Sequence, residues 1–158
     1  FMIESMTRTF ADTDAAIVDL RDGFGGSADG YPDVFFRPAV LMERNAASAQ
    51  DKQVYGYAKP LILLINEGTG SAKEVFAYMM KTSRRAKLVG SRTAGKLLTG
   101  NVVRINPWAF LIVPRMNVLL DGKRIEGVGI EPDIVLQTEY GPDGKDLFIE
   151  EAIKTLAQ

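Results

Sequence analysis

Short apolar runs alternate with glycine-rich turns along the first two thirds of the chain. The runs at 15–20, 61–65 and 86–90 contain almost no polar residue and are bounded by turn residues. Runs of this length are typical of strands buried on both faces of a parallel sheet. Between the second and third runs, apolar residues recur at helical spacing over 71–83. A strand, turn, helix and strand in this order predict parallel strands joined by a right-handed crossover.

The rest of the chain adds strands and one closing helix. We expect one α/β domain over residues 1–158, with a mainly parallel sheet flanked by helices and a few additional strands near the C-terminus. The other expected elements are a helix end at 1–10, an exposed loop at 45–53, strands at 40–44, 102–105, 110–120 and 133–136, and a helix at 147–156.

The composition excludes several kinds of site. Hydrophobic residues make up 46% and charged residues 25% of the 158 residues, as in ordinary globular domains. A net charge of -1 favours neither nucleic acid nor an anionic membrane as partner. The chain has no cysteine and no histidine, which excludes disulfides, thiolate or histidine metal sites and a self-contained Ser-His-Asp triad. We therefore expect no metal and no cofactor.

Ser71 stands where a buried strand, a Gly-Thr-Gly turn and a helix meet. A hydroxyl at this point faces helix N–H groups and the positive end of the helix dipole, which stabilise a developing anion. Serine is also a preferred helix N-cap, and Glu74 stands three residues later, as in a capping box. Ser71 is therefore a candidate nucleophile, with plain capping as the alternative.

Lys96 follows the third strand, in the loop 92–96. A lysine acts as a general base near neutral pH only when it is uncharged, and burial beside apolar groups favours that form by lowering its pKa. In a chain without histidine, a Ser-Lys dyad is the simplest way to activate a hydroxyl. The alternative is a solvated surface lysine, which is what most lysines are.

Gly25 and Gly26 follow the first strand. A glycine pair at the carboxyl end of a parallel strand lets backbone N–H groups point at a ligand. Together with the N–H of Ala72, this turn predicts an oxyanion hole, and a plain tight turn is the alternative. Two further patterns predict structural roles, namely an ion pair of Asp19 with Arg21 and a solvated helix end at 84–87.

Four segments, taken together and in order, resemble one family. Lys96 follows Ser71 by 25 positions, the spacing that this family uses between nucleophile and lysine, and the likeness runs from about residue 10 to 137. The segments are Ile17–Arg21 with Gly25-Gly26, Lys59–Gly68 with Ser71–Glu74, Arg85–Lys96, and Gly127–Asp133. The family that they resemble is the C-terminal processing peptidases, also called tail-specific proteases.

The resemblance implies a ClpP/crotonase-like fold and a serine endopeptidase that cleaves near the C-termini of proteins. It assigns Ser71 as nucleophile, Lys96 as base, and the N–H groups of Gly25, Gly26 and Ala72 to the oxyanion. The family often places a glutamine four residues after the lysine, or an aspartate eleven after the serine. Gly100 and Thr82 stand at those positions, so the third catalytic residue stays open.

Two alternatives accompany this interpretation: a non-catalytic binding or scaffold protein on the same fold, and a tricorn-like peptidase whose histidine comes from outside this chain. The N-terminus reads like the middle of a helix, so we expect a catalytic-core fragment without the upstream PDZ domain that family members usually carry. The expected partners are protein or peptide substrates, with a possible homo-oligomer. By resemblance, the expected location is outside the bacterial cytoplasm, in the periplasm or cell envelope.

Overall fold

The computed structural model describes residues 10, 12–26, 31–36, 40–43 and 52–158. The helix end expected at 1–10 and most of the loop expected at 45–53 lie outside these residues.

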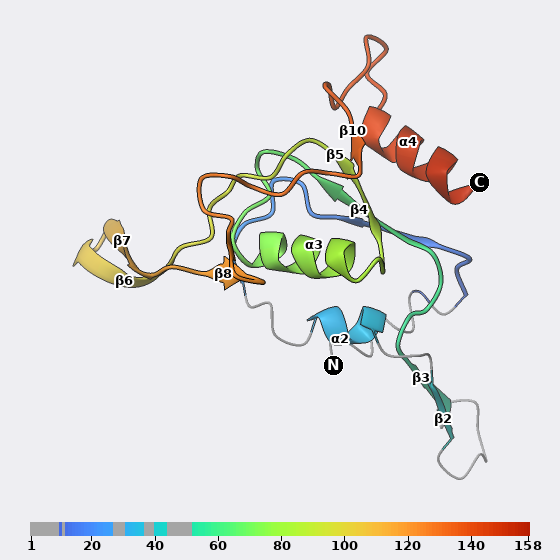
Figure 1. The fold of residues 1–158 in the computed structure, drawn as a ribbon, viewed down its shortest axis with the longest axis horizontal. Coiled ribbons are helices and arrows are strands. Elements are labelled where there is room, and N and C mark those ends of the chain that lie inside the picture. The colour runs from blue at the N-terminus through green and yellow to red at the C-terminus, as the bar shows by residue number, and fades with distance from the viewer. Residues whose placement is uncertain (1–9, 11, 27–30, 37–39, 44–51) are drawn as a thin grey trace.

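A parallel sheet forms the centre of the molecule (Figure 1). Its strands are β1 (Ala16–Asp19), β4 (Leu61–Ile65), β5 (Lys87–Gly90) and β10 (Ile134–Val135), in the order β1-β4-β5-β10. Every neighbouring pair runs parallel, and α3 (Ala72–Thr82) connects β4 to β5. The α/β fold with a mainly parallel sheet is therefore confirmed.

Both faces of the sheet are covered, which explains why β4 is apolar throughout. Leu61, Leu63 and Ile65 belong to the cluster that contains residues of α3, whereas Ile62 and Leu64 belong to the one that contains residues of α4 (Leu147–Leu156). Successive side chains of a strand point to opposite faces. The strand thus fills two cores at once, and the three layers hold its carboxyl end rigidly.

Before residue 60, one helix and one strand were not expected from the sequence. The short helix α2 (Tyr31–Phe36) places Phe35 in the core, where its ring lies 5.7 Å from that of Phe76 and 6.3 Å from that of Tyr57. The strand β3 (Lys52–Tyr55) pairs antiparallel with β2 (Val40–Glu43). The strand expected at 40–44 is confirmed as β2.

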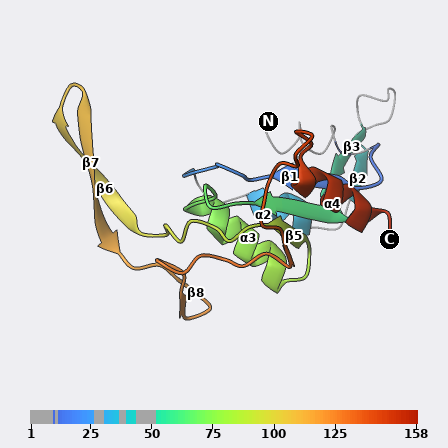
Figure 2. The same cartoon turned by 90° about the horizontal axis from the view of Figure 1, so that it is seen from above.

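A long hairpin projects from the body of the molecule (Figures 1 and 2). It consists of β6 (Thr99–Asn106) and β7 (Ala109–Met116), which pair antiparallel. The strand expected at 110–120 ends at Met116 instead, and residues 119–120 form β8 (Leu119–Leu120) with β9 (Lys123–Arg124). We call residues 99–116 the arm.

Candidate active site

Three turns meet at the carboxyl edge of the sheet, after β1, β4 and β5. The N–H of Gly70 donates to the carbonyl of Gly23 (3.0 Å), and Phe24 forms a parallel bridge with Gly70. The N–H of Ser71 donates to the carbonyl of Lys96 (3.0 Å). The structure therefore brings together the glycine turn after β1 (residues 21–26), the serine turn after β4 (residues 66–71) and the lysine loop after β5 (residues 92–96). The positions of these segments after parallel strands predict this.

Ser71 has an unusual backbone, with φ 58° and ψ -127°. An ordinary N-cap residue lies in the extended region with negative φ, whereas positive φ costs a residue other than glycine roughly 1–3 kcal/mol. Strain of this kind is found where a nucleophilic serine is held on a sharp strand-to-helix turn. Capping alone does not require this conformation.

Glu74 fastens the serine turn to the lysine loop. Its carboxyl group is fully buried and accepts four hydrogen bonds, which leave it no free acceptor position to act as a base. Oε2 accepts from the N–H groups of Ser71 (3.0 Å) and Lys96 (2.9 Å), and Oε1 from the N–H of Gly95 (2.8 Å) and the hydroxyl of Thr93 (2.6 Å). The capping interaction expected of Glu74 is present, but its wider role was missed because the partners lie about twenty positions away in the sequence.

The lysine loop is braced from behind by residues 127–130. The N–H of Gly127 donates to the carbonyl of Gly95 (2.8 Å), and the hydroxyl of Thr93 accepts from the N–H of Ile130 (2.8 Å). A Cβ at Gly129 would collide with the carbonyl oxygen of Thr93, so only glycine fits there. These contacts fix the backbone of Lys96, while Lys96 itself is an exposed residue.

The glycine turn offers an open backbone beside Ser71. Gly25 and Gly26 have φ of 76° and 88°, and no atom of the described residues lies within 4 Å of where a Cβ of Gly25 would stand. Ala72 is the first residue of α3, where helix N–H groups lack partners inside the helix. Lys73 was not singled out from the sequence, yet its ammonium lies 3.7 Å from where a Cβ of Gly26 would stand. A cation thus lies next to the candidate oxyanion site.

A buried cation holds the end of β1. The ion pair expected between Arg21 and Asp19 is confirmed at 2.6 Å, and Arg21 also pairs with Glu139 (2.9 Å) and Asp146 (2.7 Å), the N-cap of α4. Asn66 adds a second brace, since its Oδ1 accepts the N–H of Asp22 (3.0 Å). These contacts of Arg21 and Asn66 therefore hold the first residues of the glycine turn in place.

Neither departure from the family pattern supplies a third catalytic residue. Thr82 lies at the far end of α3 and donates its hydroxyl to the carbonyl of Tyr78 (2.8 Å). Gly100 lies on the arm, where a Cβ would collide with the backbone of Val113. Among the described residues, no group of three or more acidic side chains is placed to hold a metal ion.

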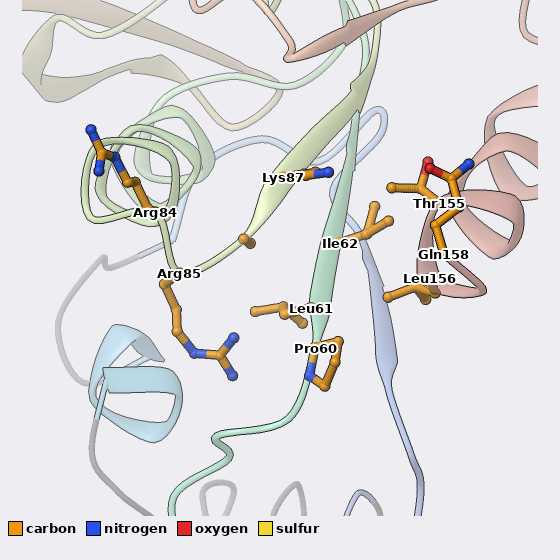
Figure 3. A pocket seen from close by; sticks show the side chains of 10 residues that line it. Pro60, Leu61, Ile62, Arg84, Arg85, Lys87, Thr155, Leu156 and Gln158 are labelled. Carbon is orange, nitrogen blue, oxygen red and sulfur yellow. The ribbon is translucent and has the colours of Figure 1, made fainter.

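A separate hollow lies at the opposite edge of the sheet, where β4 and β5 begin (Figure 3). Leu61, Ile62 and Leu156 line it, and Arg84 points away from it. The solvated helix end expected at 84–87 is wrong for Arg85, which donates to the carbonyls of Phe35 (2.6 Å) and Lys59 (2.9 Å). The residues with candidate chemistry are therefore at the carboxyl edge of the sheet.

Comparison with known proteins decides the family. The family model of peptidase family S41 matches residues 2–136. The chain belongs to peptidase family S41. It is 29% identical over 166 residues to a carboxy-terminal-processing protease of Bartonella bacilliformis, covering 86% of this chain and 38% of that protein. It is 30% identical over 138 residues to the chloroplastic carboxyl-terminal-processing peptidase 3 of Arabidopsis thaliana, covering 80% of this chain and 27% of that one. The resemblance to C-terminal processing peptidases is thereby confirmed.

The fold of this S41 chain is shared with a larger protease. The crystal structure of the tricorn protease superposes with a TM-score of 0.74 at 24% identity, over 94% of this chain and 16% of that one. The chain spans less than half of the length of the curated relatives described above. Within the part of the chain that the structure describes, no helix is long and apolar enough to cross a membrane.

Proposed function

We propose that this chain is the catalytic core of a serine endopeptidase that cleaves near the C-termini of protein substrates, with Ser71 as nucleophile and Lys96 as its base. The positive φ of Ser71 carries the proposal, because a merely structural cap does not need a strained backbone. Membership of the S41 family and the relatives' printed names support the reaction class. The hydrogen bond between the backbones of Ser71 and Lys96 supports the pairing.

The reaction follows from these positions. The Ser71 hydroxyl transfers its proton to the uncharged Lys96 amine while Oγ bonds to the carbonyl carbon of the scissile peptide. The N–H groups of Gly25 or Gly26 and of Ala72 stabilise the oxyanion. The tetrahedral adduct collapses as Lys96 returns the proton to the leaving amine, which leaves an acyl-serine. Water then attacks the ester carbonyl while Lys96 accepts its proton, and the second adduct collapses as Lys96 returns that proton to Oγ, which releases the carboxylic product and Ser71.

The base in this mechanism must be shielded from water during the reaction. Lys96 is exposed in the structure, whereas proton transfer from Ser71 needs a site from which water is excluded. We infer that a bound substrate, or a segment of a longer protein, shields Lys96 during the reaction. A chain that spans only part of its relatives' length leaves room for such a segment. In that longer protein, the proposed location is outside the cytoplasm.

Covalent labelling tests the nucleophile. A fluorophosphonate probe should label the chain, and Ser71→Ala should abolish labelling. Ser83→Ala is the matched control, because Ser83 is an exposed serine at the other end of the same helix and should label like the wild type. Labelling that survives Ser71→Ala, or a wild-type chain that takes up no probe at high concentration and alkaline pH, contradicts the proposal.

Substitution of the lysine tests the base and separates the alternatives. Lys96→Met should slow acylation about 10²–10⁴-fold, whereas Lys87→Met, an exposed lysine at the start of β5, should have no effect. An unchanged rate in Lys96→Met together with loss in Ser71→Ala would assign the base to a residue from outside this chain, as in the tricorn-like alternative. Absence of labelling in every variant would favour the scaffold alternative.

A further inference from the structure

The arm exposes an unusual amount of apolar surface. Within the described residues, its two strands pair with each other and with no other strand, and they extend away from the body of the molecule (Figures 1 and 2). Trp108 at the tip is 93% exposed, and Phe110 and Ile112 are each 61% exposed. The large apolar side chains exposed on the arm are Val102, Val103, Ile105, Trp108, Phe110, Leu111, Ile112, Val113 and Met116.

Both faces of the arm are apolar. Cross-strand partners share a face, and successive partners alternate between faces. Val102 pairs with Ile112, so these two side chains lie on one face. Val103 pairs with Leu111 on the other. A hairpin that covered the core of its own chain would be apolar on one face and polar on the other. This pattern instead indicates a two-stranded ribbon whose two faces both pack against other protein surfaces.

The two faces differ in charge. Arg104 pairs with Phe110 and therefore lies on the face of Val102 and Ile112, which we call the charged face. The opposite face has Asn101 and Val113 beside Val103 and Leu111, and over these pairs it has no charge, so we call it the uncharged face. Arg115 stands at the register shift near the base of the arm, outside these pairs. Two uncharged faces can meet around a two-fold axis without placing like charges together.

The amount of surface suggests a partner of protein size. An aromatic side chain has roughly 150–250 Å² of surface and an aliphatic one less, so the partly exposed apolar side chains of the arm leave on the order of 1,000 Å² in water. Apolar patches on monomeric proteins seldom exceed roughly 300–600 Å², and a stable interface buries about 800 Å² on each partner. The arm reaches that size only if both faces are buried.

The formal charges of the arm and of the rest of the chain indicate on which surface the charged face packs. Residues 99–116 contain Arg104 and Arg115 and no acidic residue, a formal charge of +2, whereas the whole chain has -1. The remainder of the chain therefore has -3. An arm on the body of another copy brings opposite charges together, which favours that encounter.

We propose that the arm joins two copies of this chain into a two-fold dimer, each arm packing its charged face on the partner's body and its uncharged face on the partner's arm. This arrangement covers both apolar faces and pairs the positive arm with the negative body. It does not depend on the peptidase activity.

The mass of the chain in solution tests the dimer. Light scattering after size exclusion at about 100 µM should give twice the 17.3 kDa of one chain. Leu111→Lys charges the uncharged face and Ile112→Lys the charged face, on adjacent residues of one strand. Each should weaken the dimer at least tenfold. The matched control is Ile153→Lys, a residue that is 56% exposed on α4 at the far side of the body, and it should leave the dimer unchanged (Figure 1).

Further variants separate loss of the dimer from loss of the fold. Leu111→Thr and Ile112→Thr retain strand propensity and should weaken the dimer in the same direction, and an unchanged denaturation midpoint shows that the body still folds. Arg104→Glu should weaken the dimer whereas Arg104→Lys should not. A wild-type chain that stays at 17.3 kDa overturns the proposal, as does a dimer lost equally in Ile153→Lys. Loss in only one of the two arm variants overturns burial of both faces.

Discussion

The backbone of Ser71 has a conformation that a purely structural helix cap does not need. Its φ of 58° is held by two hydrogen bonds from its own N–H, to the carbonyl of Lys96 and to the carboxyl group of Glu74. Both acceptors are fixed, since Glu74 is buried and the Lys96 backbone is bonded in turn to Glu74. The surrounding structure therefore holds the serine in a conformation that it would not adopt by itself.

Replacing Ser71 in two ways should separate activity from stability. Both Ser71→Gly and Ser71→Ala should lose probe labelling. Ser71→Gly should be more stable than Ser71→Ala by about 1 kcal/mol, because glycine accepts positive φ without strain. Denaturant titration of the two variants measures the difference. Equal stabilities, or a more stable alanine variant, would show that the serine turn stores no strain.

At this scale, sequence reasoning found the residues that local pattern marks and missed those that distant contacts define. Ser71 follows a strand and a glycine turn, and this local pattern was visible. Glu74 was expected only as a capping residue. Its contacts with Thr93 and Gly95 depend on how β5 returns beside β4, which no local pattern records. The position of Lys73 beside the glycine turn was missed for the same reason.

At the scale of elements, Arg21 ties the end of β1 to the start of α4. Its buried guanidinium contacts three carboxylates, and Asp19 is the most exposed of them. Partial burial alone would raise the pKa of Asp19, but hydrogen bonds from Arg21 and its charge outweigh that effect and lower the pKa below the ordinary 3.8. The folded state is therefore stabilised when the carboxyl group of Asp19 is ionised.

This coupling predicts how stability changes with pH. A lowered folded-state pKa contributes stability above about pH 3.8, and this stability is lost as the pH falls through the folded value. Asp19→Asn should cost up to about 1 kcal/mol at pH 7, because the pair is half-exposed, and its deficit should shrink toward pH 2. Denaturation midpoints across this range measure it, with the exposed Asp14→Asn as control. A deficit that persists unchanged at pH 2 would show that Asp19 acts by packing and not by charge.

Elements with a strong local period were predictable, and short elements fixed by distant contacts were not. The strand at 61–65 and the helix at 147–156 have the expected bounds. The helix α2 has only six residues and is held by Phe35 against Phe76, some forty positions away. The strand β3 is mostly polar and exists through its pairing with β2. Neither shows a period that sequence alone could identify.

At the scale of the whole molecule, the exposure of Lys96 limits what residues 1–158 can do alone. The proposed proton transfer needs a site from which water is excluded, whereas Lys96 is exposed in residues 1–158. We expect residues 1–158 to cleave an unfolded protein substrate slowly or not detectably at pH 7. A longer protein that covers Lys96 should cleave the same substrate faster at pH 7. Equal rates for the two proteins at equal concentration would show that residues 1–158 form a complete enzyme.

The glycines around the serine and lysine turns leave little space for any side chain. A Cβ at Gly68 would collide with Asp22, one at Gly90 with the carbonyl of Ile65, and one at Gly129 with Thr93. None of these glycines has a side chain with which to touch a substrate. A scan of all single substitutions, scored by growth or by labelling, should nevertheless rank them among the least tolerant positions. Positions at this edge should therefore be intolerant of substitution because backbone segments pack closely there, and not only because of catalysis. Intolerance alone would assign too many residues to the active site.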